Sequence, residues 1–369
     1  MDRTKPPYRA EHIGSFIRPK RLIEARTAFN KGKLSADDLR EIEDEEIRAV
    51  IAMQERVGVR VITDGEMRRN NWRDRFFENV DGFAIETIES SFTFTEDSGK
   101  QYKAMPVPRV SGKLRRREKL TADDFGFLVK HTRRTAKATL PAPGVVHFMA
   151  GDKALAGSPY SNRKMFFDDV TTIYRQEIKD LAALGCRYVQ IDDTSLAIIC
   201  DPKNQELIRR RGEKPDELID DYICAINESI KDRPTDMVVG VHMCRGNAGK
   251  GVASGGYGPV AHKMFNNLAV DAFFMEFDDE RSGDFSPLKE VPRDKVIVLG
   301  IVSTKRPELE PADEVQRRVE EAARYVDMDR LCLSPQCGFA SIFNHARFTP
   351  DLEERKLAHV VELADRIWR

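Results

Sequence analysis

The feature that most constrains the fold is a regular alternation of short apolar runs and longer amphipathic stretches after residue 136. The apolar runs predict strands at residues 136–140, 187–191, 238–241, 271–275, 296–301 and 331–333. Stretches with apolar positions at helical spacing predict helices at residues 163–184, 214–230, 259–268, 311–325 and 352–368. Strands that alternate with helices form right-handed βαβ units, so this pattern predicts a parallel sheet.

The amino-terminal part supplies the strands that this sheet still needs. Residues 9–18 suggest a short strand and turn, and residues 59–63 suggest a second strand. Between them, residues 35–57 predict a helix, because Ser35 with Asp38 resembles a capping box and apolar positions follow at helical spacing. Eight strands separated mostly by helices predict a closed (β/α)8 TIM barrel that spans residues 1–369 as a single domain.

One stretch, residues 80–115, breaks the alternation. Residues 92–95 and 107–114 look like two strands around a turn at residues 96–100, which predicts an inserted β-hairpin. A hairpin here could cover the mouth of an active site. The basic run at residues 113–119 is more typical of a solvated face than of an anion site.

Side chains that can bind a metal follow three of the predicted strands. His242 and Cys244 are two residues apart, so they project from the same side of a strand end. Glu276 follows a second strand and Cys337 follows a third. A His-x-Cys pair alone more often reflects packing. Four such groups at one end of a barrel, where barrel enzymes keep their chemistry, instead predict a Zn²⁺ site built from thiolate, imidazole and carboxylate ligands.

Composition excludes several classes of partner and location. The chain is 41% hydrophobic and 33% charged with a net charge of −1, so it has no basic surface for nucleic acid or an anionic membrane. Its six dispersed cysteines indicate reduced thiols. No stretch reads as a signal peptide or a membrane span, and no phosphate-binding loop is present. We therefore expect a cytoplasmic protein.

These motifs resemble the catalytic domain of cobalamin-independent methionine synthase, within the superfamily shared with uroporphyrinogen decarboxylase. The resemblance covers nearly the whole chain, and the short forms of the family look closest. Its most specific element is the set His242, Cys244, Glu276 and Cys337, whose counterparts in the family are the four zinc ligands. The resemblance implies a TIM barrel and a zinc-dependent methyltransferase.

The resemblance also implies a site for homocysteine. The family's Ile-Gly-Ser turn matches Ile13, Gly14 and Ser15, which with the neighbouring backbone would hold the carboxylate of the amino acid. The family's Gly-Glu and Gln-Ile-Asp motifs match at Glu66 and Asp192. Two carboxylates that converge on one ammonium form charge-assisted hydrogen bonds, so these residues would bind the amino group.

The sequence departs from the full-length enzymes at positions that serve the methyl donor. Their folate-contacting glutamate becomes Ile198, their folate-contacting tryptophan falls near Phe148 or Met149, and their proton-donating histidine becomes Val302. The donor therefore stays open between a methylated folate, a methylated corrinoid protein and a small methyl-sulfur or methoxy compound.

The predicted reaction is methyl transfer to a thiol, in the first instance homocysteine to give methionine. One alternative is zinc-dependent alkyl transfer to a non-amino-acid thiol such as coenzyme M. Another is a zinc- or thiol-binding protein without turnover, whereas a uroporphyrinogen-type decarboxylase would not need these metal ligands. Oligomeric state is left open, and no proton donor is assigned among the candidates His12, His147 and His345.

Overall fold

A computed structural model describes residues 3–95, 99–246, 253–344 and 346–369. Its main sheet is parallel and six-stranded, in the order β12-β11-β10-β9-β8-β7. The strands are β7 (Ala138–Pro141), β8 (Tyr188–Asp193), β9 (Val238–Met243), β10 (Ala272–Glu276), β11 (Val296–Val302) and β12 (Leu331–Pro335). All residues of β7, β8, β10, β11 and β12 are buried, as expected for parallel strands covered on both faces.

The ring is completed by short strands and by the amino-terminal segment. β1 (Val61–Ile62) pairs in parallel with β6 (Thr135–Ala136), which leads directly into β7. Residues 9–11 bond to β12, with N–H···O distances of 2.8 Å in both directions at Leu333. The amino-terminal segment also contacts the residue that follows β1, because the Thr63 hydroxyl donates to the carbonyl of Gly14 at 2.7 Å. The predicted TIM barrel is therefore confirmed.

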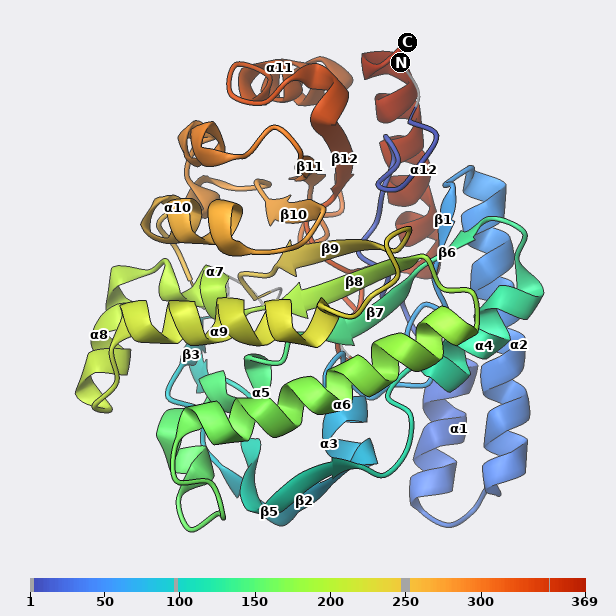
Figure 1. The fold of residues 1–369 in the computed structure, drawn as a ribbon. Coiled ribbons are helices and arrows are strands. Elements are labelled where there is room, and N and C mark those ends of the chain that lie inside the picture. Colours follow the sequence, from blue (N-terminus) through green and yellow to red (C-terminus); the bar gives the residue numbers. More distant parts are fainter. Residues whose placement is uncertain (1–2, 96–98, 247–252, 345) are drawn as a thin grey trace.

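Helices surround the sheet (Figure 1). The longer ones are α1 (Lys20–Asn30), α2 (Ala36–Val57), α4 (Ala122–His131), α6 (Arg163–Ala183), α9 (Pro215–Ile230), α10 (Gly258–Asn267), α11 (Ala312–Ala322) and α12 (Pro350–Ile367). Shorter helices are α3 (Asp74–Asn79), α5 (Val145–Phe148), α7 (Ser195–Ile199) and α8 (Pro202–Arg210). Within the described part of the chain, no helix combines the length and apolar character needed to cross a lipid bilayer.

The helix predicted at residues 35–57 forms as α2. Ser35 is its N-cap and accepts a hydrogen bond from the backbone N–H of Asp38 at 3.0 Å. The helix ends at Gly58, whose φ of 96° is a left-handed conformation that favours glycine. The predicted cap at Ser35 and the predicted extent of the helix are therefore confirmed.

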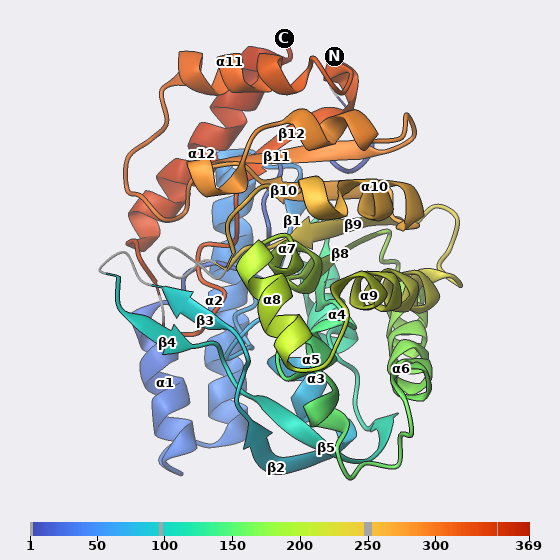
Figure 2. The ribbon, with the colours of Figure 1, turned by 90° about the vertical axis from the view of Figure 1, so that its left-hand side faces the viewer.

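The insertion is confirmed, but the predicted strand pairing within it was wrong. β5 (Val107–Arg116) pairs with β2 (Val80–Ile88), whereas β3 (Thr93–Thr95) pairs with β4 (Gln101–Lys103). β2 and β4 were missed because polar residues and a glycine interrupt their strand pattern. Figure 2 shows these as two separate antiparallel ribbons. Part of the predicted turn, residues 96–98, lies outside the described residues.

A buried carboxyl group in α12 predicts a pH effect on stability. Glu353 accepts a hydrogen bond from the N–H of Ile17 at 2.7 Å. Burial raises its pKa from 4.5 to about 8, although this bond and the charge of Arg18 oppose the shift. The protonated Glu353 carboxyl therefore makes its full contribution to the free energy of unfolding below pH 4.5. This contribution is lost as the pH rises through about 8.

Glu353→Gln should remove this dependence. Between pH 4.5 and 8 the free energy of unfolding of the variant should fall less steeply than that of the parent, by about 1.4 kcal/mol per pH unit. Denaturant titrations at several pH values measure both slopes, and equal slopes would contradict the prediction.

Candidate metal and substrate site

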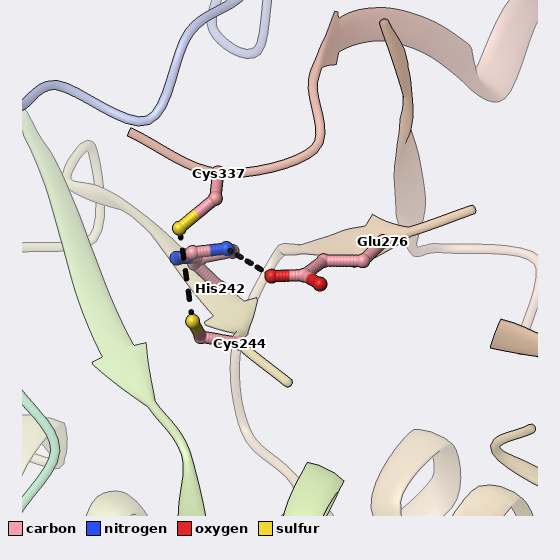
Figure 3. A group of neighbouring side chains, drawn as sticks. All are labelled: His242, Cys244, Glu276 and Cys337. Atoms are coloured by element: carbon pink, nitrogen blue, oxygen red, sulfur yellow. Dashed lines mark hydrogen bonds and ion pairs between the residues drawn. The ribbon is translucent and has the colours of Figure 1, made fainter. Parts of the chain in front are cut away.

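Four side chains converge at the carboxyl ends of the strands (Figure 3). His242 lies near the end of β9 and Cys244 just beyond it, Glu276 is the last residue of β10, and Cys337 follows β12. One ligand atom from each residue lies within 4.8 Å of the others. The parallel register of β9 and β10 brings His242 opposite Phe274, so Glu276 is two residues further along the neighbouring strand.

The spacing and chemistry of this cluster fit a zinc ion. The sulfur atoms of Cys244 and Cys337 are 3.7 Å apart, and tetrahedral zinc with Zn–S bonds of about 2.3 Å would place two sulfurs about 3.8 Å apart. His242 Nε2 and Glu276 Oε1 are 3.8 Å apart. Among the described residues, the buried Oε2 of Glu276 has no hydrogen-bond partner, so an acceptor is left over.

The cluster concentrates negative charge. Burial lowers the pKa of His242, but the hydrogen bond with Asp192, the nearby carboxylate of Glu276 and the charge of Cys244 outweigh it and raise that pKa to about 10. The hydrogen bond with Cys244, together with burial, raises the pKa of the Cys337 thiol well above its ordinary value. Protons compensate the charge of these groups, and a divalent cation would do so in their place.

Asp192 orients the histidine of the cluster. Its Oδ1 lies 3.1 Å from His242 Nδ1, which leaves Nε2 directed toward the other three residues. Gln190 donates to the same Asp192 oxygen at 2.7 Å and to the carbonyl of Ile13 at 2.7 Å. Lys137 in turn donates to Gln190 Oε1 at 2.9 Å. This second role of Asp192 was not predicted, although Gln190 and Asp192 share one face of a strand in the sequence.

Two further residues that the sequence reasoning missed hold Glu276 in place. Tyr257 accepts a hydrogen bond from the N–H of Glu276 at 2.9 Å. The N–H of Arg245 donates to Glu276 Oε1 at 3.3 Å, and the Arg245 guanidinium lies 4.2 Å from the centre of the Tyr257 ring. Arg245 belongs to the Cys-Arg-Gly-Asn motif that the family shares, but no role was predicted for it, and Tyr257 lies in no motif that the sequence reasoning used.

The cluster opens onto a pocket that most of the predicted substrate residues share. The residues from both groups that line it are Ile13, Ser15, Glu66, Asp192, His242, Cys244 and Cys337. Glu276 is fully buried and is not part of the pocket lining. Gly14 is not part of it either. Its φ of 122° is left-handed, and a Cβ at this position would lie tightly against the side chains of Thr139 and Thr63, so the turn favours glycine.

Glu66 is held rigidly with one oxygen available. Its φ of 57° is unusual for a residue with a side chain, and such conformations concentrate at functional sites. Oε1 accepts hydrogen bonds from Thr139 at 2.9 Å and Arg69 at 3.2 Å. Oε2 is buried without a partner among the described residues. Burial raises the pKa of Glu66 and the charge of Arg69 opposes this shift.

Ser15 packs against the turn that carries Cys337. Its carbonyl accepts a hydrogen bond from the N–H of Phe339 at 2.9 Å. A Cβ at Gly338 would overlap with the Ser15 hydroxyl oxygen, so glycine is needed for this close approach. The contact places the predicted carboxylate-binding turn beside the thiol cluster.

The positions linked to the methyl donor divide into two groups. Met149 and Ile198 line the pocket. Phe148 instead stacks on Phe92 with ring centres 4.5 Å apart, and Val302 is fully buried in β11.

The candidate histidines do not supply a proton donor in the described part of the pocket. His12 bonds to the carbonyl of Val61, and His147 bonds to Tyr222 and Asp152. Neither lines the pocket, and His345 lies outside the described residues.

A second group of possible ligand atoms surrounds His147. It consists of His147, Asp152 and Glu213. Arg211 forms an ion pair with Glu213, and Arg163 lies 3.6 Å from both carboxylates. Cations of the chain itself therefore already balance this group.

A TIM barrel with a His, Cys, Glu, Cys cluster on the pocket at its strand ends defines a barrel enzyme with a candidate metal site. The family model for the catalytic domain of cobalamin-independent synthase matches residues 9–364. The chain therefore belongs to the cobalamin-independent methionine synthase family, and it is a methyltransferase of the cobalamin-independent type.

Relatives support this assignment over the whole chain. The uncharacterized protein YxjG of Bacillus subtilis is 40% identical to this chain. The alignment covers 100% of this chain and 97% of YxjG. The methionine synthase of Saccharolobus solfataricus is 27% identical over 88% of this chain and 86% of that protein.

Solved structures agree with the fold. A Listeria monocytogenes protein, solved as a candidate vitamin-B12-independent methionine synthase, matches with a TM-score of 0.79 and 34% identity over 100% of both chains. A B12-independent methionine synthase from Shewanella sp. W3-18-1, solved in complex with selenomethionine, matches with a TM-score of 0.77 and 21% identity over 97% of both chains.

Proposed function

We propose that this protein, as a single barrel domain with an insertion, uses zinc to transfer a methyl group to the thiol of homocysteine. The proposed zinc ligands are His242, Cys244, Glu276 and Cys337. The observation that carries the proposal is the convergence of four ligand atoms within 4.8 Å beside a pocket that two carboxylates also line.

The two cysteines of the cluster suit a zinc ion that activates a thiol. Zinc, when bound, would hold the substrate sulfur as a thiolate, whereas a free thiol with a pKa of about 8.5 is mostly protonated at neutral pH. The thiolates of Cys244 and Cys337 add negative charge, which favours an electron-rich sulfur on the substrate. Cys244 is the only one of the four ligands that is partly exposed, so the substrate thiol would approach from its side.

The remaining predicted residues suit the amino-acid part of homocysteine. Glu66 and Asp192 line one pocket and would bind the ammonium group through charge-assisted hydrogen bonds. The turn Ile13, Gly14 and Ser15 would hold the carboxylate. Glu66 Oε2 supports this assignment, because it is a buried acceptor that a ligand N–H could satisfy.

Two alternatives are less well supported. Coenzyme M carries a sulfonate, which Glu66 and Asp192 would repel at the position proposed for the ammonium. A purely structural zinc site would normally be closed by its four ligands. Here Cys244 and Cys337 line a pocket, which favours a site with access for a substrate.

The proposal is tested by metal analysis and single-turnover chemistry. We expect one zinc per chain and formation of methionine from homocysteine, read out by mass spectrometry across folate, corrinoid and small methyl donors. Transfer to coenzyme M in preference to homocysteine would favour the first alternative. A zinc-loaded protein that transfers a methyl group to neither thiol would favour the second.

Substitutions at Asp192 should separate its two roles. In Asp192→Asn the amide oxygen can still accept the His242 Nδ1–H, so zinc should stay bound while the apparent homocysteine constant rises at least about 10-fold through loss of a charged hydrogen bond. In Asp192→Ala zinc affinity should also fall, by about 10- to 100-fold, as for other groups that orient a metal ligand.

Zinc content and homocysteine saturation curves measure both effects. Glu66→Gln is the matched control, because it removes the other carboxylate of the pocket. In the described structure Glu66 bonds to Arg69 and Thr139 and to no residue of the cluster. Equal zinc loss in Asp192→Asn and Asp192→Ala would show that Asp192 acts only on the cluster.

A further inference from the structure

A lysine lies in the interior of the barrel, deeper than the residues of the candidate site. Lys137 is only 1% exposed and joins β6 to β7. Its ammonium nitrogen lies 4.9 Å from the centre of the Phe274 ring and 5.4 Å from the centre of the Tyr188 ring. Lysine is rarely buried to this extent without partners, and apolar side chains usually fill the interior of a barrel. The groups that Lys137 contacts therefore indicate why it is there.

The ammonium of Lys137 contacts two parts of the candidate homocysteine site. It donates to the carbonyl of His12, the residue just before the turn at residues 13–15. It also donates to Gln190 Oε1 at 2.9 Å. The carboxylate of Glu11, at 3.4 Å, supplies a counter-ion. Lys137 is therefore bonded to the predicted carboxylate-binding turn and to Gln190 as well as to an acid.

Gln190 extends these contacts to both ends of the amino-acid site. Lysine has only donors, so the oxygen of the Gln190 amide faces Lys137 and the nitrogen faces away from it. That nitrogen donates to the carbonyl of Ile13 and to Asp192 Oδ1, both at 2.7 Å. The same Asp192 oxygen lies 3.1 Å from His242 Nδ1. One buried cation thus orients the amide that links the predicted carboxylate-binding turn to the predicted ammonium-binding carboxylate.

The second carboxylate of the pocket has separate support. Glu66 Oε1 accepts hydrogen bonds from Thr139 at 2.9 Å and from Arg69 at 3.2 Å. Neither contact involves Lys137. Loss of Lys137 should therefore disturb Asp192 and the turn but leave Glu66 in place, which limits the expected effect on ligand binding.

A buried ion pair that only stabilises the fold is the alternative explanation for Lys137. Replacement of such a pair by apolar side chains is often neutral or stabilising, so the pair with Glu11 does not by itself account for a lysine here. The two explanations differ in what they predict. A purely structural pair would affect every ligand of the pocket alike. A group that positions the turn and Asp192 would affect only ligands that carry an amino-acid group.

We propose that Lys137 is a positioning residue for the amino-acid end of homocysteine. It acts through Gln190 and the His12 carbonyl, which together set the distance between the turn at residues 13–15 and Asp192. Lys137 does not line the pocket, so it touches neither the substrate thiol nor the methyl group. This inference rests on the proposed function and deepens it, because it names a residue on which recognition of the amino acid depends.

The test compares ligands with and without an amino-acid group by calorimetric titration of the zinc-loaded protein. This measurement needs no methyl donor. Homocysteine and methionine carry the ammonium and carboxylate groups, whereas 1-propanethiol is homocysteine without them. Lys137→Met should weaken binding of homocysteine and methionine by about 10-fold, the size expected for a hydrogen bond to a charged group. Binding of 1-propanethiol and the zinc content should change less than about twofold, because the reacting sulfur and the metal are not contacted.

Two further variants separate positioning from stability. Glu11→Gln/Lys137→Met removes both charges of the ion pair, so no buried acid is left unpaired if Lys137→Met alone does not fold. It should show the same selective loss. Gln190→Leu cuts the link to Asp192 while Lys137 keeps its counter-ion, and methionine binding should weaken by a similar factor. In Lys137→Met/Gln190→Leu the loss should be smaller than the product of the two single losses, because both act on one chain of contacts.

Lys356→Met is the matched control. Lys356 is also fully buried, and its ammonium donates to the carbonyl of Glu308 at 2.6 Å and pairs with Glu310 at 3.5 Å. It does not line the pocket. The same substitution at this lysine should leave the binding of all three ligands unchanged.

Several outcomes would overturn the inference. Folded variants that bind homocysteine and methionine as the parent does would make Lys137 a structural residue. Equal weakening for 1-propanethiol would mean a general disturbance of the pocket. Independent losses that multiply in the double variant would show that Lys137 does not act through Gln190. A zinc-loaded parent that binds neither homocysteine nor methionine would overturn the proposed function, and the inference with it.

Discussion

Replacing Cys244 or Cys337 with serine is expected to weaken zinc binding by at least about 100-fold, since each of four ligands carries a share of the roughly 10–16 kcal/mol by which comparable sites bind zinc. Methyl transfer should fall with it, because a free homocysteine thiol is mostly protonated and is not oriented. Metal analysis after dialysis and single-turnover transfer measure the two losses.

Cys224→Ser is the matched control for this prediction. Cys224 is exposed on α9 and belongs to neither group of possible ligands, so its substitution should leave zinc and activity unchanged. A Cys337→Ser variant that keeps one tightly bound zinc and full activity would remove the cluster from the mechanism.

Homocysteine is expected to replace Glu276 at the zinc. In the resting protein X-ray absorption should report two sulfur ligands, from Cys244 and Cys337, and two light-atom ligands, from His242 and Glu276. Addition of homocysteine should change this to three sulfurs and one light atom. Glu276 is the expected leaving ligand because a carboxylate is the hardest donor of the four, and zinc with two thiolates favours a third sulfur.

Homoserine, which carries a hydroxyl in place of the thiol, should leave two sulfurs at the metal. An increase in total coordination with Glu276 still bound at about 2.0–2.2 Å would contradict the displacement. Loss of the His242 signal in place of the carboxylate would also contradict it. The buried environment of Glu276, with Arg245 N–H at 3.3 Å from Oε1, offers the released carboxylate a hydrogen-bond donor.

Much of the fold could be predicted because its signals are local. Ser35 and Gly58 bound α2 through capping chemistry that involves only near neighbours. The strands of the main sheet are buried on both faces and therefore appear as continuous apolar runs. The insertion was harder, because β2 and β4 are partly exposed and their pairing partners depend on contacts far along the chain.

In the candidate site, the residue types could likewise be predicted from the sequence, whereas the long-range contacts between them could not. His242, Cys244, Glu276 and Cys337 could be selected from the sequence, because parallel strands carry the residues at their carboxyl ends to one mouth. The bond between Asp192 and His242 joins residues 50 positions apart, and no local pattern indicates it.

The order of strands and helices, and the residue types at the strand ends, were determined by the sequence alone, because backbone geometry and side-chain burial act over a few neighbouring residues. The tertiary structure alone decided which atoms meet. It placed two sulfurs 3.7 Å apart and directed His242 Nε2 into the cluster. Such distances depend on closure of the whole barrel, which joins segments near residues 10 and 333.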